Sequence, residues 1–463
     1  MPWLAVAVLS MLTLPAAALA ADPPTQESEK AVLSIPFEKY TLDNGLEVIL
    51  SVDRKLPVVA VNIWYHVGAF HEQPGRTGFA HLFEHMMFQG SKHVEDDAHI
   101  SLLQQIGATD VNGTTNFDRT NYFQTVPAHH LETALWLESD RMGFLLDALT
   151  PEKLDNQREV VKNERRERTD AAPYGLASEK AWQALFPAPH PYYGSVIGSM
   201  EDLDAATMDD VVSFFETWYA PSNATLAIVG DFDVEETKKL VERYFGSLPS
   251  RPKPKAPRVK DVALQEEVVI RMEEPVATLP LVLMYWHSPR IFTEGDATAD
   301  IVASALGTGK ASRLYQRLIY EKKLAQSISA YQYSLGAQSA FGIEVVARPG
   351  KSTDEIVAEI DAVLAELRES GVTDEEIRRA RNRFETRRLL GLQRVGGFDG
   401  KADMLQRYNH FLGDPGKLAW DLQRYELVTT DDTREFARTI LDPHRRVVLH
   451  AIPPASREGG AEG

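Results

Sequence analysis

The chain repeats one short structural unit, once near its middle and once near its end. Residues 209–229 read as a helix, an x-Pro turn at Tyr219–Pro221 and a β-strand. Residues 431–451 show the same succession at nearly the same spacing, with the turn at Leu441–Pro443. Two copies of one α/β unit are the most economical interpretation, and this limits the chain to folds built from two similar halves.

A proline-spaced basic segment, Pro249–Pro257, separates these halves and has the composition of a linker. The chain of 463 residues is long enough for two domains of about 200 residues each. We therefore expect an N-terminal domain over 35–248, a Pro-rich linker over 249–260 and a C-terminal domain over 261–455, followed by a disordered tail over 456–463.

Strand and helix signals alternate in both halves. In the first half, a turn at Asp43–Gly45 predicts a hairpin over residues 40–50, and a run of β-branched and aromatic residues predicts a strand over 57–67. Residues 171–203 are rich in Pro, Tyr and Gly. The remaining patterns predict helices over 129–146, 151–168, 207–219, 234–245, 297–306, 312–321, 353–370 and 373–393, and strands over 224–229, 268–272, 279–287, 327–334 and 339–347.

The N-terminus predicts export from the cytoplasm. Residues 1–20 form an uncharged apolar run that ends in the small-x-small pattern Ala18-Leu19-Ala20, which is typical of a cleaved signal peptide. The alternative is an N-terminal membrane anchor. Residues 21–34 form a polar spacer, and no later stretch is apolar enough to span a membrane. A periplasmic or secreted protein is expected.

Composition restricts the partners and the metal chemistry. The net charge of −18 argues against nucleic acid as a partner, because binding to phosphates requires clustered Lys and Arg. The chain has no cysteine, so disulfides and thiolate ligands are both excluded. Any zinc site must therefore be built from His, Asp and Glu.

One pentapeptide has the spacing of a metal site. His81-Leu82-Phe83-Glu84-His85 reads H-x-x-E-H, the zinc-protease signature H-E-x-x-H in reverse order. On a helix, His81 and His85 lie one above the other on one face and can bind the same ion. Glu84 lies beside them and can act as general base on a metal-bound water. The alternative is a buried polar helix face whose histidines are bonded to the backbone.

A catalytic zinc ion takes three protein ligands, so a third is needed. In the helix predicted over 151–168, Glu164 falls near one face with Val160 and Val161 and should point inward. An inward carboxylate needs a partner, which is either a metal or an Arg in a buried salt bridge. Beside a two-histidine site that lacks a ligand, the metal is the favoured partner.

The segment Val111–Phe117 predicts the first arm of a hairpin with residues 120–126. It is rich in Thr and Asn, and central strands are seldom so polar, so we expect an edge strand. An exposed edge can bind an extended peptide as an added strand. The alternative is a plain exposed loop or edge without a ligand.

In combination, these motifs resemble the pitrilysin (inverzincin) family of zinc metallopeptidases. The likeness is strongest to its short-chain branch, which includes the mitochondrial processing peptidase and bacterial two-subunit peptidases. It extends over about residues 35–453 and rests on Leu42–Leu46, the Gly68–Ala69 and Glu72 region, His81–Gly90, Asn156–Glu164 and Ala220–Asp231.

The resemblance implies an α+β fold of two homologous α/β half-domains, each a mostly antiparallel sheet covered by helices, forming half of a clamshell. It implies that His81, His85 and Glu164 bind one Zn²⁺ per chain and that Glu84 activates the water.

The resemblance also places the peptide substrate along the polar edge segment. Asn112 is then a candidate for a contact to the substrate backbone, and Thr114 and Thr115 belong to the same substrate-binding strand.

Two positions depart from the family pattern. Many relatives have a second Glu seven residues before the third ligand, where this chain has Gln157, whose amide can still support the site by hydrogen bonding. Complete members also place an Arg and a Tyr after a Ser-Arg-Leu segment, but here those positions hold Ile319 and Gln326, and Tyr320 is one residue out of register. We expect a homologous partner subunit to supply the Arg and the Tyr, in a heterodimer.

The sequence thus predicts a zinc endopeptidase that hydrolyses unfolded or short peptides and forms the metal-bearing subunit of that heterodimer. Two alternatives remain open. One is a non-catalytic scaffold or assembly subunit of the same fold, against which the intact four-residue motif argues. The other is a peptidase dedicated to processing one precursor.

Overall fold

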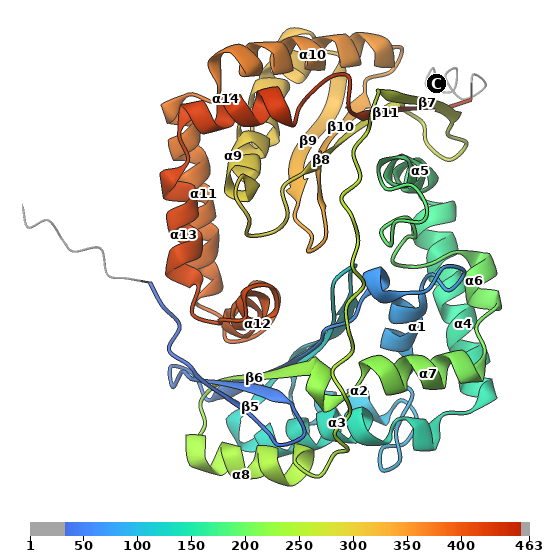
Figure 1. Cartoon of the computed structure of the whole chain (residues 1–463), viewed down its shortest axis with the longest axis vertical. Helices are drawn as coiled ribbons and strands as arrows, with labels where there is room; N and C mark the ends of the chain where they lie inside the picture. The colour runs from blue at the N-terminus through green and yellow to red at the C-terminus, as the bar shows by residue number, and fades with distance from the viewer. Residues whose placement is uncertain (1–32, 455–463) are drawn as a thin grey trace, which may run out of the picture. The chain divides into compact units, whose positions relative to one another are not determined.

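Two sheets with covering helices make up the described part of the chain, residues 33–454, in a computed structural model (Figure 1). The predicted signal peptide over 1–20, the tail over 456–463 and nearly all of the spacer over 21–34 lie outside the described residues. Within residues 33–454, no helix combines the length and the apolar character needed to cross a membrane.

The first sheet has six strands in the order β1-β2-β6-β3-β5-β4. Its β2 and β6 run parallel, and all its other neighbouring strands are antiparallel. The polar segment that the sequence predicts at an edge is β4, the last strand of this sheet. The strands are β1 (Glu38–Thr41), β2 (Glu47–Val52), β3 (Val58–Tyr65), β4 (Thr109–Thr115), β5 (Thr120–Pro127) and β6 (Ala224–Gly230).

The second sheet repeats the first without a counterpart of β1. Its order is β7-β11-β8-β10-β9, with β7 and β11 parallel and the other pairs antiparallel. The edge strand β9 therefore corresponds to β4. The strands are β7 (Val268–Glu273), β8 (Leu281–Ser288), β9 (Ala325–Tyr333), β10 (Ser339–Ala347) and β11 (Val447–Ile452).

The helices repeat as well. In both predicted copies a helix begins with a capping box, Thr207 with Asp210 in α7 and Thr429 with Asp432 in α14, and leads into the parallel-paired strand β6 or β11. The helices are α1 (Phe79–Met86), α2 (Ala98–Gln105), α3 (Leu131–Phe144), α4 (Pro151–Arg165), α5 (Gly175–Leu185), α6 (Met200–Asp204), α7 (Met208–Trp218), α8 (Val234–Phe245), α9 (Asp296–Gly307), α10 (Thr353–Ser370), α11 (Asp374–Gly391), α12 (Lys401–Leu412), α13 (Leu418–Leu427) and α14 (Thr430–Thr439).

The two halves exchange helices. Helix α12 lies against β3 and β6 of the first sheet, where the buried Gln406 donates to the carbonyls of Asn62 (2.8 Å) and Thr225 (2.7 Å). In return, α5 from the first half packs on β8 and β11, with Ala181 among the apolar side chains of the second sheet (Figure 1). Each half therefore completes the other, and the described residues from Ser34 onward form one compact unit.

The α+β fold of two similar halves is confirmed, together with the hairpin β1–β2 and the edge position of β4. Four local features differ from the prediction. The region 171–203 contains α5 and α6, and residues 401–427 form α12 and α13, which the sequence analysis did not predict. The helix expected over 312–321 is π-helical at Tyr315–Glu321. On α4, Val160 and Val161 were both expected to be buried. Val160 is 39% exposed, whereas Val161 is buried.

Candidate metal centre

Helix α1 presents two different faces. Phe79, Leu82 and Phe83 are buried in the core of the first half. His81, Glu84 and His85 lie half-buried on the other face. The spacing of the apolar residues thus determines which face of α1 packs on the core, and the polar motif lies on the opposite face.

The start of α1 is fixed by a carboxylate. The two oxygens of Glu72 accept the backbone N–H groups of Gly78 (3.0 Å) and Ala80 (2.8 Å), which have no acceptor within the helix. Burial outweighs these hydrogen bonds and raises the pKa of Glu72 to about 8. Gly78 has φ +86°, and a Cβ there would lie 2.6 Å from the carbonyl oxygen of Ile197, so this position requires glycine.

Helix α4 brings the predicted third ligand to the two histidines. It begins at Pro151 with the Thr150 side chain as its cap, and it packs beside α1. The Glu164 Oε2 atom lies 3.3 Å from Nε2 of His85 and 3.8 Å from Nε2 of His81. Residues that are distant in sequence therefore converge on one point between two helices.

These three groups lie close enough together to hold one metal ion, and the protonation of His81 and Glu164 suits zinc. Their ligand atoms all lie within 4.8 Å of one another. Zinc bonds of about 2.0–2.2 Å require tetrahedral ligand atoms to be about 3.3–3.6 Å apart. Burial and the neighbouring His85 lower the pKa of His81 to about 4, and the hydrogen bond from His85 lowers the pKa of Glu164. A neutral imidazole and an ionised carboxylate are the forms that bind a metal.

An arginine holds the other oxygen of Glu164. Its Oε1 lies 2.5 Å from Nη1 of Arg168, one turn further along the chain. The expected alternative to a metal was a buried salt bridge to an Arg. An Arg partner is present, but its side chain is 77% exposed, and it leaves Oε2 directed at the histidines. Arg168 was not among the predicted site residues, although its four-residue spacing from Glu164 was a usable signal.

The predicted base is held by the edge strand. Thr115 Oγ1 donates to Glu84 Oε2 at 2.6 Å. Burial raises the pKa of Glu84, and this hydrogen bond opposes the rise. The Thr114 hydroxyl donates to Asn121 Oδ1 at 2.5 Å. Both threonine hydroxyls are thus engaged within the chain, which leaves the backbone of β4 as the group that a peptide can pair with.

A cavity of about 240 Å³ opens beside Glu84 and contains the other two predicted residues. The exposed Asn112 and the buried Gln157 both line it, and neither makes a hydrogen bond or ion pair with His81, His85 or Glu164 in the described part of the chain. The apolar side chains of Phe88 and Ile100 also line it; Phe88 lies in the motif segment His81–Gly90, whereas nothing in its sequence context marks Ile100.

Gly113 sets the distance between the edge strand and the helix. A Cβ at this position would lie 3.1 Å from Glu84 Cγ and 3.0 Å from the Phe88 ring. A larger residue would push β4 away from α1, so glycine keeps the open strand edge close to the base.

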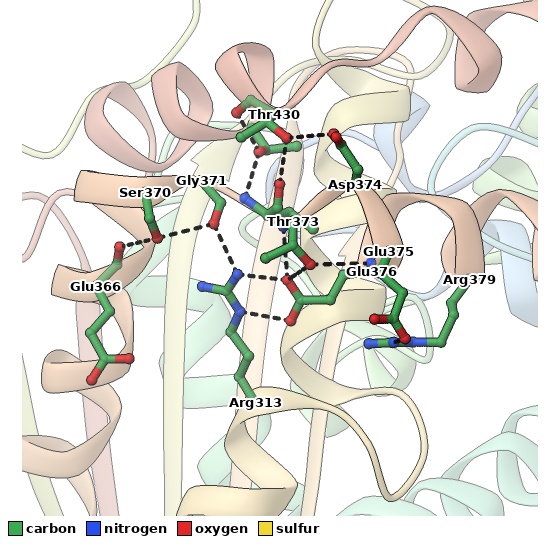
Figure 2. A network of polar contacts seen from close by, with 12 residues as sticks. Arg313, Glu366, Ser370, Gly371, Thr373, Asp374, Glu375, Glu376, Arg379 and Thr430 are labelled. Carbon is green, nitrogen blue, oxygen red and sulfur yellow. Dashed lines mark hydrogen bonds and ion pairs between the residues drawn. The ribbon is translucent and has the colours of Figure 1, made fainter.

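The second half does not place an Arg or a Tyr at the family positions. Ile319 packs against the core of the second half, and Gln326 is exposed on β9. The arginine of the Ser-Arg-Leu segment, Arg313, is engaged elsewhere. Figure 2 shows it paired with both oxygens of Glu376 (2.8 and 2.6 Å) and with the Gly371 carbonyl (2.9 Å), at the turn between α10 and α11.

Comparisons with known proteins agree with this fold. Residues 47–184 match the family "Insulinase (Peptidase family M16)", and residues 205–384 match the family "Peptidase M16 inactive domain". The chain therefore belongs to peptidase family M16, the pitrilysin family, whose curated relatives are named zinc proteases.

Three relatives illustrate the range of similarity. The zinc protease PqqE of Helicobacter pylori is 29% identical over 346 residues, which cover 73% of this chain and 76% of that protein. A crystal structure of a protease from H. pylori has a TM-score of 0.85 at 25% identity and covers 91% of this chain and 100% of its own. The periplasmic protease PqqL of Escherichia coli shares the fold, with a TM-score of 0.74 and 19% identity over 93% of this chain but 49% of its own.

Proposed function

We propose that this chain is a zinc-dependent endopeptidase that hydrolyses unfolded or short peptides. The main support for this proposal is that His81, His85 and Glu164 converge beside Glu84, next to the edge strand β4. A scaffold subunit would have no use for this arrangement. The names of the curated relatives support the same reaction class and the same metal.

The side chains of this site would divide the reaction between them. When bound by the two histidines and Glu164, zinc would acidify a water and polarise the peptide carbonyl. Glu84 accepts the proton of the attacking water and transfers it to the leaving amine. Its raised pKa brings it nearer to neutral pH, where one group serves best as base and then as acid.

The backbone of β4 orients the substrate. Its outer edge is free to pair with an extended peptide, and main-chain hydrogen bonds of this kind bind without regard to sequence. Thr115 would take part through its backbone groups and Asn112 through its exposed side chain. The Thr114 carbonyl already accepts from Arg119 at 2.9 Å, so Thr114 would act only as part of the substrate-binding strand. Gln157 would contact the substrate or support the site from the cavity wall.

Substitution of Glu84 tests the chemistry. Glu84→Gln should lower kcat about 10²–10⁴-fold, the usual contribution of a general base, and should leave one zinc bound per chain. Glu164→Gln should lose the zinc, whereas Glu159→Gln, exposed on the same helix, should keep both zinc and activity. Metal content by mass spectrometry and cleavage of a quenched fluorescent peptide measure the two properties. Wild-type turnover by Glu84→Gln would overturn the proposal.

We further propose that a homologous subunit supplies the missing Arg and Tyr, because Ile319 is packed in the core and Arg313 is bound to Glu376. PqqL, at about twice the length of this chain, is large enough to combine two such units. Peptide cleavage should rise at least tenfold when a partner with Arg and Tyr at these positions is added. Full activity of the isolated chain would contradict this expectation.

The proposed setting is the periplasm or the outside of the cell, as the N-terminal sequence predicts. Cell fractionation with an epitope at the C-terminus tests it, and retention in the cytoplasm would argue against it.

A further inference from the structure

A second and larger cavity, of about 630 Å³, lies where the edge strand β4 ends. Phe117, two residues beyond the last residue of β4, is part of its wall. The Phe117 ring stacks on Trp182 of α5 at 5.4 Å, and Trp182 in turn contacts Tyr285 (6.2 Å) and Tyr333 (5.7 Å) of the second sheet. An aromatic wall thus runs from the end of β4 across to the second half.

The floor of this cavity is made by two tyrosines over a glycine. Tyr285 of β8 and Tyr331 of β9 lie opposite Gly342 of β10, one on each side, and their hydroxyls are 3.1 Å apart. A Cβ at Gly342 would lie 2.7 Å from the Tyr331 ring and 3.0 Å from the Tyr285 ring. The two rings therefore lie close over the glycine, and both line the cavity.

One carboxylate stands beside this floor. Glu344 follows Gly342 by two residues, so its side chain lies on the same face of the sheet, and it lines the cavity half-buried. Among residues 33–454 it makes no hydrogen bond or ion pair, and burial raises the pKa of its carboxyl group.

The other charged groups of the cavity are already paired. Arg168 is bound to Glu164 at 2.5 Å, and Glu179 is bound to Arg165 at 2.8 Å. Glu344 is left as the one uncompensated charge of the cavity among the described residues. A partly buried carboxylate without a partner is costly, and a cation placed next to it removes that cost.

We propose that this cavity binds a basic side chain, Lys or Arg, of the peptide substrate. The inference rests on the proposed peptidase function and names its substrate class. The cation would lie over the rings of Tyr285 and Tyr331, which attract positive charge, with its charge-assisted hydrogen bond to Glu344. A neutral aromatic side chain would fill the same space but leave Glu344 unpaired. The net charge of −18 also attracts basic peptides.

Peptide binding tests the proposal without requiring turnover. The protein is the full chain carrying Glu84→Gln, and the probes are fluorescent, terminally blocked peptides with one Lys or its neutral analogue norleucine, scanned through every position. We expect one Lys position to bind about tenfold more tightly than its norleucine counterpart by fluorescence anisotropy. Adding Glu344→Gln should remove this difference, and adding Glu369→Gln, exposed on α10, should leave it unchanged.

Equal affinity for Lys and norleucine at every position would overturn the proposal, as would a Lys preference that survives Glu344→Gln. The comparison of the Lys and norleucine peptides uses the chain with Glu344 intact. It can therefore refute the cation site even if the Glu344→Gln variant folds poorly. Cleavage by the chain with Glu84 intact is measured separately. A Glu344-dependent Lys preference without cleavage would refute the peptidase and retain the cation site.

Discussion

The hydroxyl group of Tyr192 joins the two halves through two hydrogen bonds. It is fully buried, and its hydroxyl donates to Asp118 Oδ1 at 2.9 Å while accepting the backbone N–H of Ala337 at 3.0 Å. The second oxygen of Asp118 accepts the N–H of Gly336 at 3.0 Å. Tyr192 and Asp118 belong to the first half. The N–H groups that donate to them, those of Gly336 and Ala337, belong to the turn between β9 and β10 in the second half.

Replacing Tyr192 by Phe removes this oxygen and preserves the ring. A hydrogen bond to a charged group contributes about 1.5–3 kcal/mol and one between neutral groups about 0.5–1.5 kcal/mol. Their loss should lower the free energy of unfolding by about 2–4 kcal/mol, because the Ala337 N–H is also left without its acceptor. Cavity formation adds little, since only one atom is removed.

Urea denaturation followed by tryptophan fluorescence measures this loss. The neighbouring Tyr193→Phe is the matched control, because Tyr193 is 40% exposed and its hydroxyl makes no hydrogen bond within the described residues. The control should stay within about 0.5 kcal/mol of the wild type. A Tyr192→Phe variant that is as stable as the control would show that the two halves do not depend on this contact.

Three further predictions concern the site and its surroundings. Thr115→Val removes the hydroxyl that holds Glu84 and should lower kcat about tenfold, while Thr114→Val should stay within twofold; equal kcat values would contradict the role of Thr115. Acidification from pH 7 to pH 5 should destabilise the fold. Burial lowers the pKa of His66 to about 4 and that of His410 well below its usual value, whereas both take up protons near pH 6.5 once unfolded. The unfolded chain therefore binds more protons in this range, and the free energy of unfolding falls. Urea titrations should show a smaller loss in the double His→Gln variant of this pair, and an equal loss would refute the assignment. Chelation should abolish hydrolysis and lower the thermal midpoint, and one equivalent of Zn²⁺ should restore both; full activity in the metal-free chain would exclude the proposed site.

The local part of the site could be predicted because helical spacing alone fixes it. His81 and His85 are one turn apart on α1, and no distant contact is needed to bring them together. The prediction for Glu164 depends on which face of α4 points inward. Val160 and Val161 were both expected on that face, but only Val161 is buried, because the buried stripe on α4 is narrower than the sequence suggests.

The exchange of helices could not be predicted from sequence. The position of α12 depends on Gln406 reaching two carbonyl groups in strands far away along the chain, and no local pattern encodes such a pairing. The sequence did not predict helix α5 for a different reason. Its eleven residues lie between Pro173 and Pro187, in a region whose composition indicates turns, and its apolar face matches the other half's sheet.

The two proposed sites lie close together, because Arg168, which is paired with Glu164, also lines the larger cavity. Helix α5 packs on the second sheet through Ala181, and the next residue, Trp182, forms part of the proposed cation cavity. The same first half contributes Phe117 from the end of the strand that holds the base. Movement of one half against the other would therefore separate Glu344 from the proposed metal ligands. In the duplicated fold, we infer that the first copy retains the chemistry and that the second copy recognises the substrate, with the exchanged helices keeping the two in register.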